Sequence, residues 1–160
     1  MTEATFRATE HDHDACVDTA MKTAETICAE RGARLTAIRR RVLEIIWGGH
    51  RPIGAYDVLE QLSTEEKRAA PPTVYRALDF LLEHGLVHRV ASLNAYVGCA
   101  EPGHGGEGQF LICAQCGAAV ELRDSPVNEA IEAAARARGF VATTHTVEIS
   151  GVCANCAEAN

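Results

Sequence analysis

The chain has 160 residues, of which 47% are apolar, 5% aromatic and 23% charged, and seven are cysteines. This length allows one domain or two small ones, and no apolar run approaches the roughly eighteen residues of a membrane span. The first sixteen residues lack the basic and apolar regions of a secretion signal. We therefore expect a cytoplasmic protein without membrane partners, whose cysteines are thiols or metal ligands rather than disulfides.

The net charge of −7 is distributed unevenly along the chain. Residues 31–90 hold 10 of the 15 Lys and Arg residues and 7 of the 22 Asp and Glu residues, so they carry +3 and the remainder −10. This asymmetry is typical of a basic contact surface carried by an acidic partner half, although a solvated charge distribution gives the same pattern.

Residues 1–13 show no sustained apolar period and are expected to form a disordered extension. Apolar residues at helical spacing then predict helices over residues 14–31, 37–47, 55–62 and 72–84. Thr36 is a suitable N-cap for the second helix. The charged residues 63–70 are expected to form a loop.

The stretch from Pro71 to Arg89 predicts a helix followed at once by a strand. Pro72 suits the first helical position, and Gly85 suits the left-handed residue just past a helix end. Strands are expected over residues 86–90 and 95–97. Three or four helices closing on a two-stranded wing predict a winged helix-turn-helix domain over residues 14–97. The alternative is an ordinary amphipathic helix in a small α/β core.

The glycine-rich residues 98–108 are expected to form a hinge rather than a phosphate loop, because they contain no P-loop lysine. A second domain is expected over residues 109–160. Its predicted elements are strands over 109–112 and 119–122, a helix that starts at Ser125-Pro126, and a strand over 140–149. The fold class is therefore α+β: an N-terminal winged helix-turn-helix domain followed by a small α/β domain.

Two Cys-x-x-Cys pairs, Cys113 with Cys116 and Cys153 with Cys156, form the strongest motif of the sequence. Two such pairs can complete a tetrahedral zinc site with four thiolate ligands. The 36 residues between the pairs span the expected strand–helix–strand unit, so the metal would join its two ends. A redox dithiol is the alternative, but no thioredoxin-like context surrounds either pair.

A second set of possible ligands is less regular: His88 in the wing, Cys99 just after it, His104 in the hinge and Glu121 in the second domain. This mixture of nitrogen, sulfur and oxygen donors suits tetrahedral zinc better than magnesium or calcium. Each residue also has a separate explanation as a surface histidine, a buried thiol, a loop histidine or a solvated glutamate, and the sequence alone leaves both readings open.

Several of these motifs together resemble the ferric uptake regulator family, and within it the zinc uptake regulator branch. The resemblance is carried by PPTVYRALDFLLEHGLVHRV, the downstream YVGC, the hinge histidine and LICAQCGAAVEL, and it covers roughly residues 20–157. It implies a homodimer whose second domain is the dimerisation domain. Zinc-loaded dimers of this branch bind AT-rich inverted-repeat operators on double-stranded DNA and repress genes for zinc acquisition.

The resemblance also implies roles for individual residues. Cys113, Cys116, Cys153 and Cys156 match the structural zinc ligands, and His88, Cys99, His104 and Glu121 match the regulatory zinc site, which gives two zinc ions per chain. Arg76 matches a base-contacting position and Tyr56 a DNA-contacting tyrosine. Thr73 and Tyr75 lie beside Arg76 off the apolar stripe, and Arg39 and Arg40 are expected to contact phosphates. His145 matches a ligand of an additional site whose partners are missing here, so we expect it to be structural or vestigial.

Two other functions compete with this interpretation. A zinc hydrolase or deaminase would need an open coordination position and a general base, and neither H-x-E followed by P-C-x-x-C nor H-E-x-x-H occurs in the sequence. No enzyme activity and no small-molecule substrate are therefore expected. An iron- or peroxide-responsive regulator of the same family is the second alternative. Cys99 favours zinc, because a thiolate is softer than the His and carboxylate ligands typical of those sensors.

Overall fold

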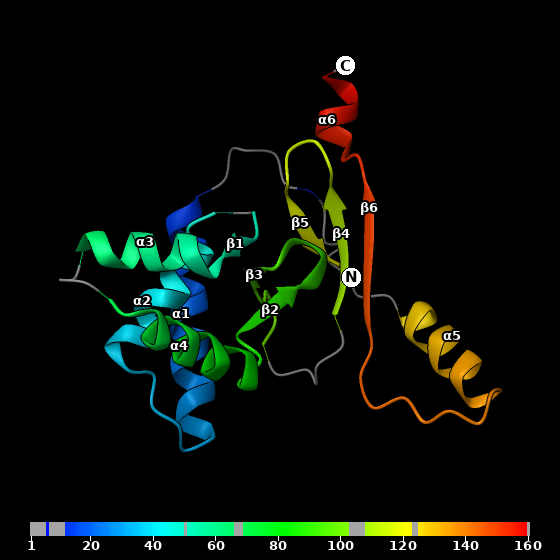
Figure 1. The fold of residues 1–160 in the computed structure, drawn as a ribbon, viewed down its shortest axis with the longest axis horizontal. Coiled ribbons are helices and arrows are strands. Elements are labelled where there is room, and N and C mark those ends of the chain that lie inside the picture. The colour runs from blue at the N-terminus through cyan, green and yellow to red at the C-terminus, as the bar shows by residue number, and fades with distance from the viewer. Residues whose placement is uncertain are drawn as a thin grey trace.

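The computed structural model describes residue 6 and residues 12–49, 51–65, 69–102, 108–122 and 125–159. The helices in these ranges are α1 (His13–Glu30), α2 (Ala37–Trp47), α3 (Ala55–Glu65), α4 (Pro71–Glu83), α5 (Ser125–Arg136) and α6 (Ala154–Glu158). The strands are β1 (Ile53–Gly54), β2 (Val87–Val90), β3 (Ala95–Gly98), β4 (Gly108–Cys113), β5 (Ala119–Glu121) and β6 (Thr146–Gly151), and a short 3₁₀ turn, η1 (Ala91–Leu93), joins β2 to β3. Figure 1 shows α1–α4 gathered on one side of two small sheets and α5 on the other side. No helix in the described ranges is long and apolar enough to cross a membrane.

The helical part of the molecule is built around α2, which contacts α1, α3, α4 and β3. The apolar stripe of α2 is buried, and Val42, Leu43 and Ile46 are at most 1% exposed. They meet the buried side chains of the neighbouring helices: Met21 and Ala24 in α1, Val58 and Leu62 in α3, and Val74, Leu78 and Leu81 in α4. Because each such side chain contributes about 1.5–3 kcal/mol when buried, this core holds the four helices in one fixed arrangement.

Helix α4 ends at the His84–Gly85 boundary that its sequence predicts, and its start is shifted by one residue. Pro71 and Pro72 occupy the first two helical positions, so the helix begins one residue earlier than expected. His84 ends it, and Gly85 follows with φ +66°. The chain then enters β2, which pairs with β3 in an antiparallel hairpin, and β3 also pairs with β1. We call β2, η1 and β3 the wing.

The structure differs from the expected elements in several further places. Asp12 caps α1 by accepting from the Ala15 N–H at 3.2 Å, so this helix begins inside the extension expected over residues 1–13. The third helix continues to Glu65, where a loop was expected. The last strand begins at Thr146 instead of residue 140. The two-residue strand β1 and the short helix α6 were not predicted, because neither is long enough to show a period.

The C-terminal sheet has the order β5-β4-β6, with β4 antiparallel to β5 and parallel to β6. In this register Phe110 of β4 lies directly between Glu121 of β5 and Glu148 of β6. Residues opposite each other on paired strands point to the same face of a sheet. Glu121, Phe110 and Glu148 therefore form one row across one face, and we call them the cross-sheet row.

The wing contacts this sheet through a second, smaller apolar cluster. Val90 of the wing is fully buried with Phe110 and Ile112 of β4, and Val97 and Ala119 pack against them. On its other side the wing lies close to α2, because a Cβ at Gly98 would be 2.4 Å from the indole ring of Trp47. The wing is thus held between the helical core and the C-terminal sheet.

Candidate metal centres and nucleic-acid interface

Four cysteines meet at one end of the C-terminal sheet, at the carboxyl ends of β4 and β6. Because these strands are parallel and Cys113 is in register with Gly151, both Cys-x-x-Cys turns start at the same edge. The ligand atoms of Cys113, Cys116, Cys153 and Cys156 all lie within 4.8 Å of one another. The Cys116 and Cys153 sulfurs are 3.9 Å apart, close to the about 3.8 Å that tetrahedral zinc with Zn–S bonds of about 2.3 Å requires. We call this group the four-cysteine site.

The electrostatics of the four-cysteine site suit a dication. Backbone hydrogen bonds from Cys116 and Cys153 lower the pKa of the Cys113 thiol to about 6. Hydrogen bonding with the Cys153 side chain raises the pKa of Cys156 to about 12. Without a metal the group therefore holds thiolate and thiol together, and a bound zinc ion would displace the remaining protons. None of the seven cysteines forms a disulfide.

A second cluster lies where the wing meets the sheet. His88 of β2, Cys99 just after β3 and Glu121 of β5 place their ligand atoms within 4.8 Å of one another. His88 Nε2 is 3.3 Å from Glu121 Oε1, and the Cys99 sulfur is 4.0 Å from Glu121 Oε2. The Cys99 residue is 2% exposed, and the side chains of His88 and Glu121 are 14% and 13% exposed. We call these three residues the wing–sheet cluster.

The wing–sheet cluster holds a proton tightly when no metal is bound. Burial disfavours the charged imidazole of His88, but hydrogen bonds and negative charge from Cys99 and Glu121 outweigh it and raise the pKa of His88 to about 9. The His88 ring also meets the Phe110 ring edge-on, with 5.5 Å between centroids. Three converging nitrogen, sulfur and oxygen donors fit zinc. His104, the fourth ligand expected from the sequence, lies outside the described residues.

His145, which matches a ligand of an additional site, takes part in a hydrogen-bond network instead. Its Nε2 lies 2.7 Å from Asn128 Oδ1, which also accepts from the side-chain amide of Gln109 at 2.5 Å. Within the described residues only the four-cysteine site and the wing–sheet cluster bring three or more possible metal ligands together. His145 therefore joins α5, β4 and the segment before β6 through polar side chains.

The side chains expected to meet DNA differ in their exposure. Tyr56 at the start of α3 is 77% exposed, Tyr75 of α4 is 45% exposed, and Arg76 is also exposed. Thr73 at the start of α4 is half-buried. Three of these four residues are thus accessible to a partner, and their contact with DNA stays a prediction.

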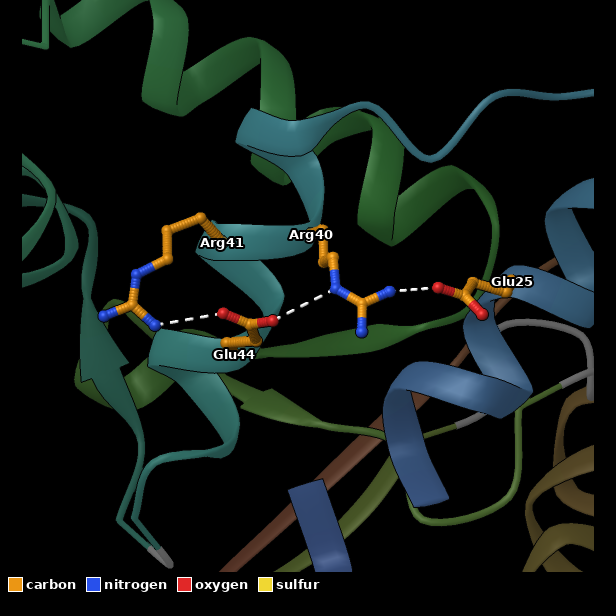
Figure 2. A network of polar contacts seen from close by, with 4 residues as sticks. All are labelled: Glu25, Arg40, Arg41 and Glu44. Carbon is orange, nitrogen blue, oxygen red and sulfur yellow. Dashed lines mark hydrogen bonds and ion pairs between the residues drawn. The ribbon is translucent and has the colours of Figure 1, made fainter. Parts of the chain in front are cut away.

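The two arginines expected to meet phosphates have partners within the chain. The guanidinium of Arg39 lies 3.6 Å from the centroid of the Phe80 ring and donates to the Arg34 carbonyl at 2.7 Å. Figure 2 shows Arg40 between Glu25 of α1 and Glu44 of α2, with Arg41 on the other oxygen of Glu44. A phosphate would compete with these contacts, so the phosphate role of Arg39 and Arg40 stays a prediction.

Two residues beside the candidate sites were not predicted from the sequence. Phe110 contacts His88 across the wing–sheet boundary, and Asn128 bonds both Gln109 and His145. No sequence signal identifies either residue, because both contacts depend on the tertiary packing of segments far apart in the chain.

The helices α1–α4 and the wing define a winged-helix fold, here joined to an α/β sheet that carries a four-cysteine site. The profile of the ferric uptake regulator family matches residues 30–150, and the chain belongs to this family. It is 44% identical to the zinc uptake regulation protein of Escherichia coli (strain K12) over 138 residues, which cover 84% of this chain and 80% of that protein.

Solved structures of the zinc branch share the whole architecture. A zinc uptake regulator complexed with zinc and DNA matches with a TM-score of 0.84 and 40% identity, covering 89% of this chain and 96% of that one. Holo XcZur matches with a TM-score of 0.81 and 44% identity, covering 88% and 99%. Apo XcZur, at 41% identity and coverage of 89% and 99%, reaches a TM-score of only 0.53. Identity and coverage are nearly equal for these last two, so neither accounts for the difference in TM-score.

The raised pKa of His88 predicts how metal binding at the wing–sheet cluster depends on pH. Below about pH 9 the imidazole carries a proton that must leave before its nitrogen can bind a metal. The zinc affinity of this cluster should therefore fall as pH falls, by at least about tenfold per pH unit between about pH 6.5 and 8. Competition with a chelator of known affinity, on protein whose four-cysteine site is already loaded, measures this slope. In His88→Gln one proton fewer should be released for each zinc ion bound, so the slope should be smaller. An unchanged slope would contradict the assignment of His88 as a ligand.

Proposed function

We propose that the chain is a zinc-responsive transcriptional repressor, whose zinc-loaded homodimer binds AT-rich inverted-repeat operators and represses genes for zinc uptake. The observation that carries this proposal is the wing–sheet cluster, because its ligands come from the wing on one side and the C-terminal sheet on the other. Because a repressor must reach its DNA operators, we also propose that the protein is cytoplasmic. We propose no catalytic activity, since the family is one of transcriptional regulators.

Two zinc ions per chain are proposed, with different roles. The four-cysteine site would hold a structural ion that ties the ends of β4 and β6 together. The wing–sheet cluster, completed by His104, would hold a regulatory ion. Zinc there supplies bonds across the boundary between the wing and the sheet. His88, Cys99 and Glu121 would hold the ion, and their positions would fix how the wing lies on the sheet.

The arrangement of the structure supports this mechanism. The TM-score is 0.81 against holo XcZur and 0.53 against apo XcZur, so the chain as a whole resembles the holo structure more than the apo structure. In a dimer this arrangement sets the spacing of the two recognition helices, which must match half-sites in successive grooves. Zinc would act by favouring the DNA-competent arrangement, to the extent of its differential affinity for the two arrangements.

Homodimer formation is proposed through the C-terminal part. The strand β6 lies at an edge of its sheet, and edge strands are ready sites for pairing with another chain. Large apolar side chains are exposed along and before this strand: Phe140 is 64%, Val141 84% and Ile149 47% exposed. We retain the domain limits 14–97 and 109–160, with 98–108 as the hinge, as part of this proposal.

The proposal is tested by separating the two sites with single substitutions. Cys99→Ser should stay folded and dimeric, keep about one zinc per chain, and lose the rise in operator affinity with free zinc, because only the regulatory ion is lost. In wild type that rise should be roughly 5- to 150-fold, the usual range for coupled sites. Cys113→Ser should lose zinc, dimer and thermal stability together, because metal binding there contributes to folding.

The test measures four properties of both variants: zinc content, oligomeric state, melting temperature and operator affinity. If Cys99→Ser unfolds while Cys113→Ser remains a stable dimer, the structural and regulatory assignments are reversed. An iron- or peroxide-responsive regulator would instead show operator binding that depends on iron or on oxidation and is indifferent to zinc.

Arg76 provides a test of DNA readout. Arg76→Ala should weaken operator binding by about 1–3 kcal/mol and relax the preference at one base position, as expected for loss of a guanine-edge contact. Arg138→Ala is the matched control, since Arg138 is an exposed arginine just after α5 that donates to the Ala134 carbonyl. Binding to a randomised operator pool measures both. A base preference identical to that of Arg138→Ala would remove Arg76 from the readout.

A further inference from the structure

The wing is held by the C-terminal sheet at a second point that involves no metal ligand. The carboxylate of Glu148 in β6 accepts the N–H of Ala91 at 2.6 Å on one oxygen and the N–H of Ser92 at 3.0 Å on the other. These two residues open η1, the turn at the tip of the wing. The first N–H groups of a helical turn have no partner within the turn, so a carboxylate is a natural acceptor for them.

The register of the sheet explains why this carboxylate reaches the wing. In the cross-sheet row, Phe110 stands between Glu121 and Glu148, and all three face the wing. Glu121 and Phe110 contact His88 at one part of β2, and Glu148 contacts the residues just beyond its end. The row therefore contacts the wing at two separate places, His88 in β2 and the start of η1, with the buried Val90 between them.

Two attachment points constrain the wing more than one. The His88 contacts and the apolar contact of Val90 both hold the wing at β2, whereas the bonds to Ala91 and Ser92 hold it at η1. The contacts are charge-assisted, and hydrogen bonds from the Ser92 side chain and from the Ser92 and Ala91 amides lower the pKa of Glu148. The carboxylate is thus ionised at neutral pH and accepts both bonds.

We propose that Glu148 is a positioning residue that latches the wing tip to the C-terminal sheet and pre-orders the regulatory zinc site and the DNA-binding arrangement. The proposal rests on the function proposed above. Because the latch forms from protein groups alone, it reduces the ordering that zinc must bring about. Removing the Glu148 contacts should weaken both zinc binding at the wing–sheet cluster and operator binding, because zinc and operator both bind the arrangement that these contacts pre-order.

Three variants of the full-length protein test the latch. Glu148→Ala removes both acceptors, Glu148→Gln keeps one acceptor oxygen without the charge, and Glu129→Gln changes an exposed glutamate of α5 as the matched control. In Glu148→Ala the regulatory zinc affinity and the operator affinity at saturating zinc should each fall roughly 3- to 10-fold, the ratio expected for one or two lost hydrogen bonds. Glu148→Gln should lie between Glu148→Ala and wild type.

Amide signals of the wing distinguish a latch from a general loss of stability. In ¹H–¹⁵N spectra the Ala91 and Ser92 signals should shift in both Glu148 variants and stay in place in Glu129→Gln, while the four-cysteine site keeps its zinc in all three. Unchanged Ala91 and Ser92 signals in Glu148→Ala, or zinc and operator affinities equal to those of Glu129→Gln, would overturn the latch. If wild-type operator binding ignores zinc, the proposed function fails, while the amide signals and the zinc affinities still decide whether the latch exists.

Discussion

The contact between the wing and the C-terminal sheet is the constraint on which the behaviour of this molecule depends. On the helical side, a large buried core fixes α1, α2, α3 and α4 relative to one another. Between the wing and the sheet, the buried apolar cluster within the described residues consists of Val90, Phe110 and Ile112 alone. A joint this small leaves the arrangement open to control by a few polar groups, because each buried side chain contributes only about 1.5–3 kcal/mol.

Besides the bonds to Glu148, the polar groups at this joint are a protonated histidine and a carboxylate without metal, and would be a metal and its ligands with zinc bound. Without metal, the raised pKa of His88 keeps the imidazole charged beside Glu121 at neutral pH. A partly buried ion pair of this kind adds little net stability, because desolvation of both charges offsets their attraction. Replacing the proton by a dication would add bonds from the ion to Cys99 and His104 as well as to His88 and Glu121. This gives a physical reason for a metal, rather than the ion pair, to set the arrangement.

Local features of the fold were predictable from the sequence, and features that depend on strand register were not. The helix over residues 37–47 and the glycine after the recognition helix agree with the structure, because apolar period and capping act within one element. The predicted start of the last strand at residue 140 was wrong. Phe140 and Val141 are residue types that favour strands, but they lie exposed in the segment before β6.

The candidate sites divide in the same way. The four cysteines were predictable because two residues between cysteines already bring both thiolates to one ion. The sequence alone did not show whether His88, Cys99 and Glu121 form one metal site or have separate roles. Only the family resemblance favoured a shared site. The acceptor role of Glu148 depends on the pairing of β4 with β6, and the partners of Arg40 in Figure 2 depend on how α1 crosses α2. Neither contact leaves a pattern in the sequence.

The most direct test of the central claim is the distance between the helical part and the C-terminal part as zinc fills the wing–sheet cluster. Pulsed EPR can measure it between spin labels on noncanonical residues that replace Glu83 in α4 and Ala133 in α5, both exposed, in dimers diluted with unlabelled chain. With the four-cysteine site loaded throughout, the distance distribution should narrow when the regulatory site fills, and it should stay broad in Cys99→Ser. An identical distribution for wild type before and after the regulatory zinc binds would contradict the claim that this ion fixes the wing on the sheet.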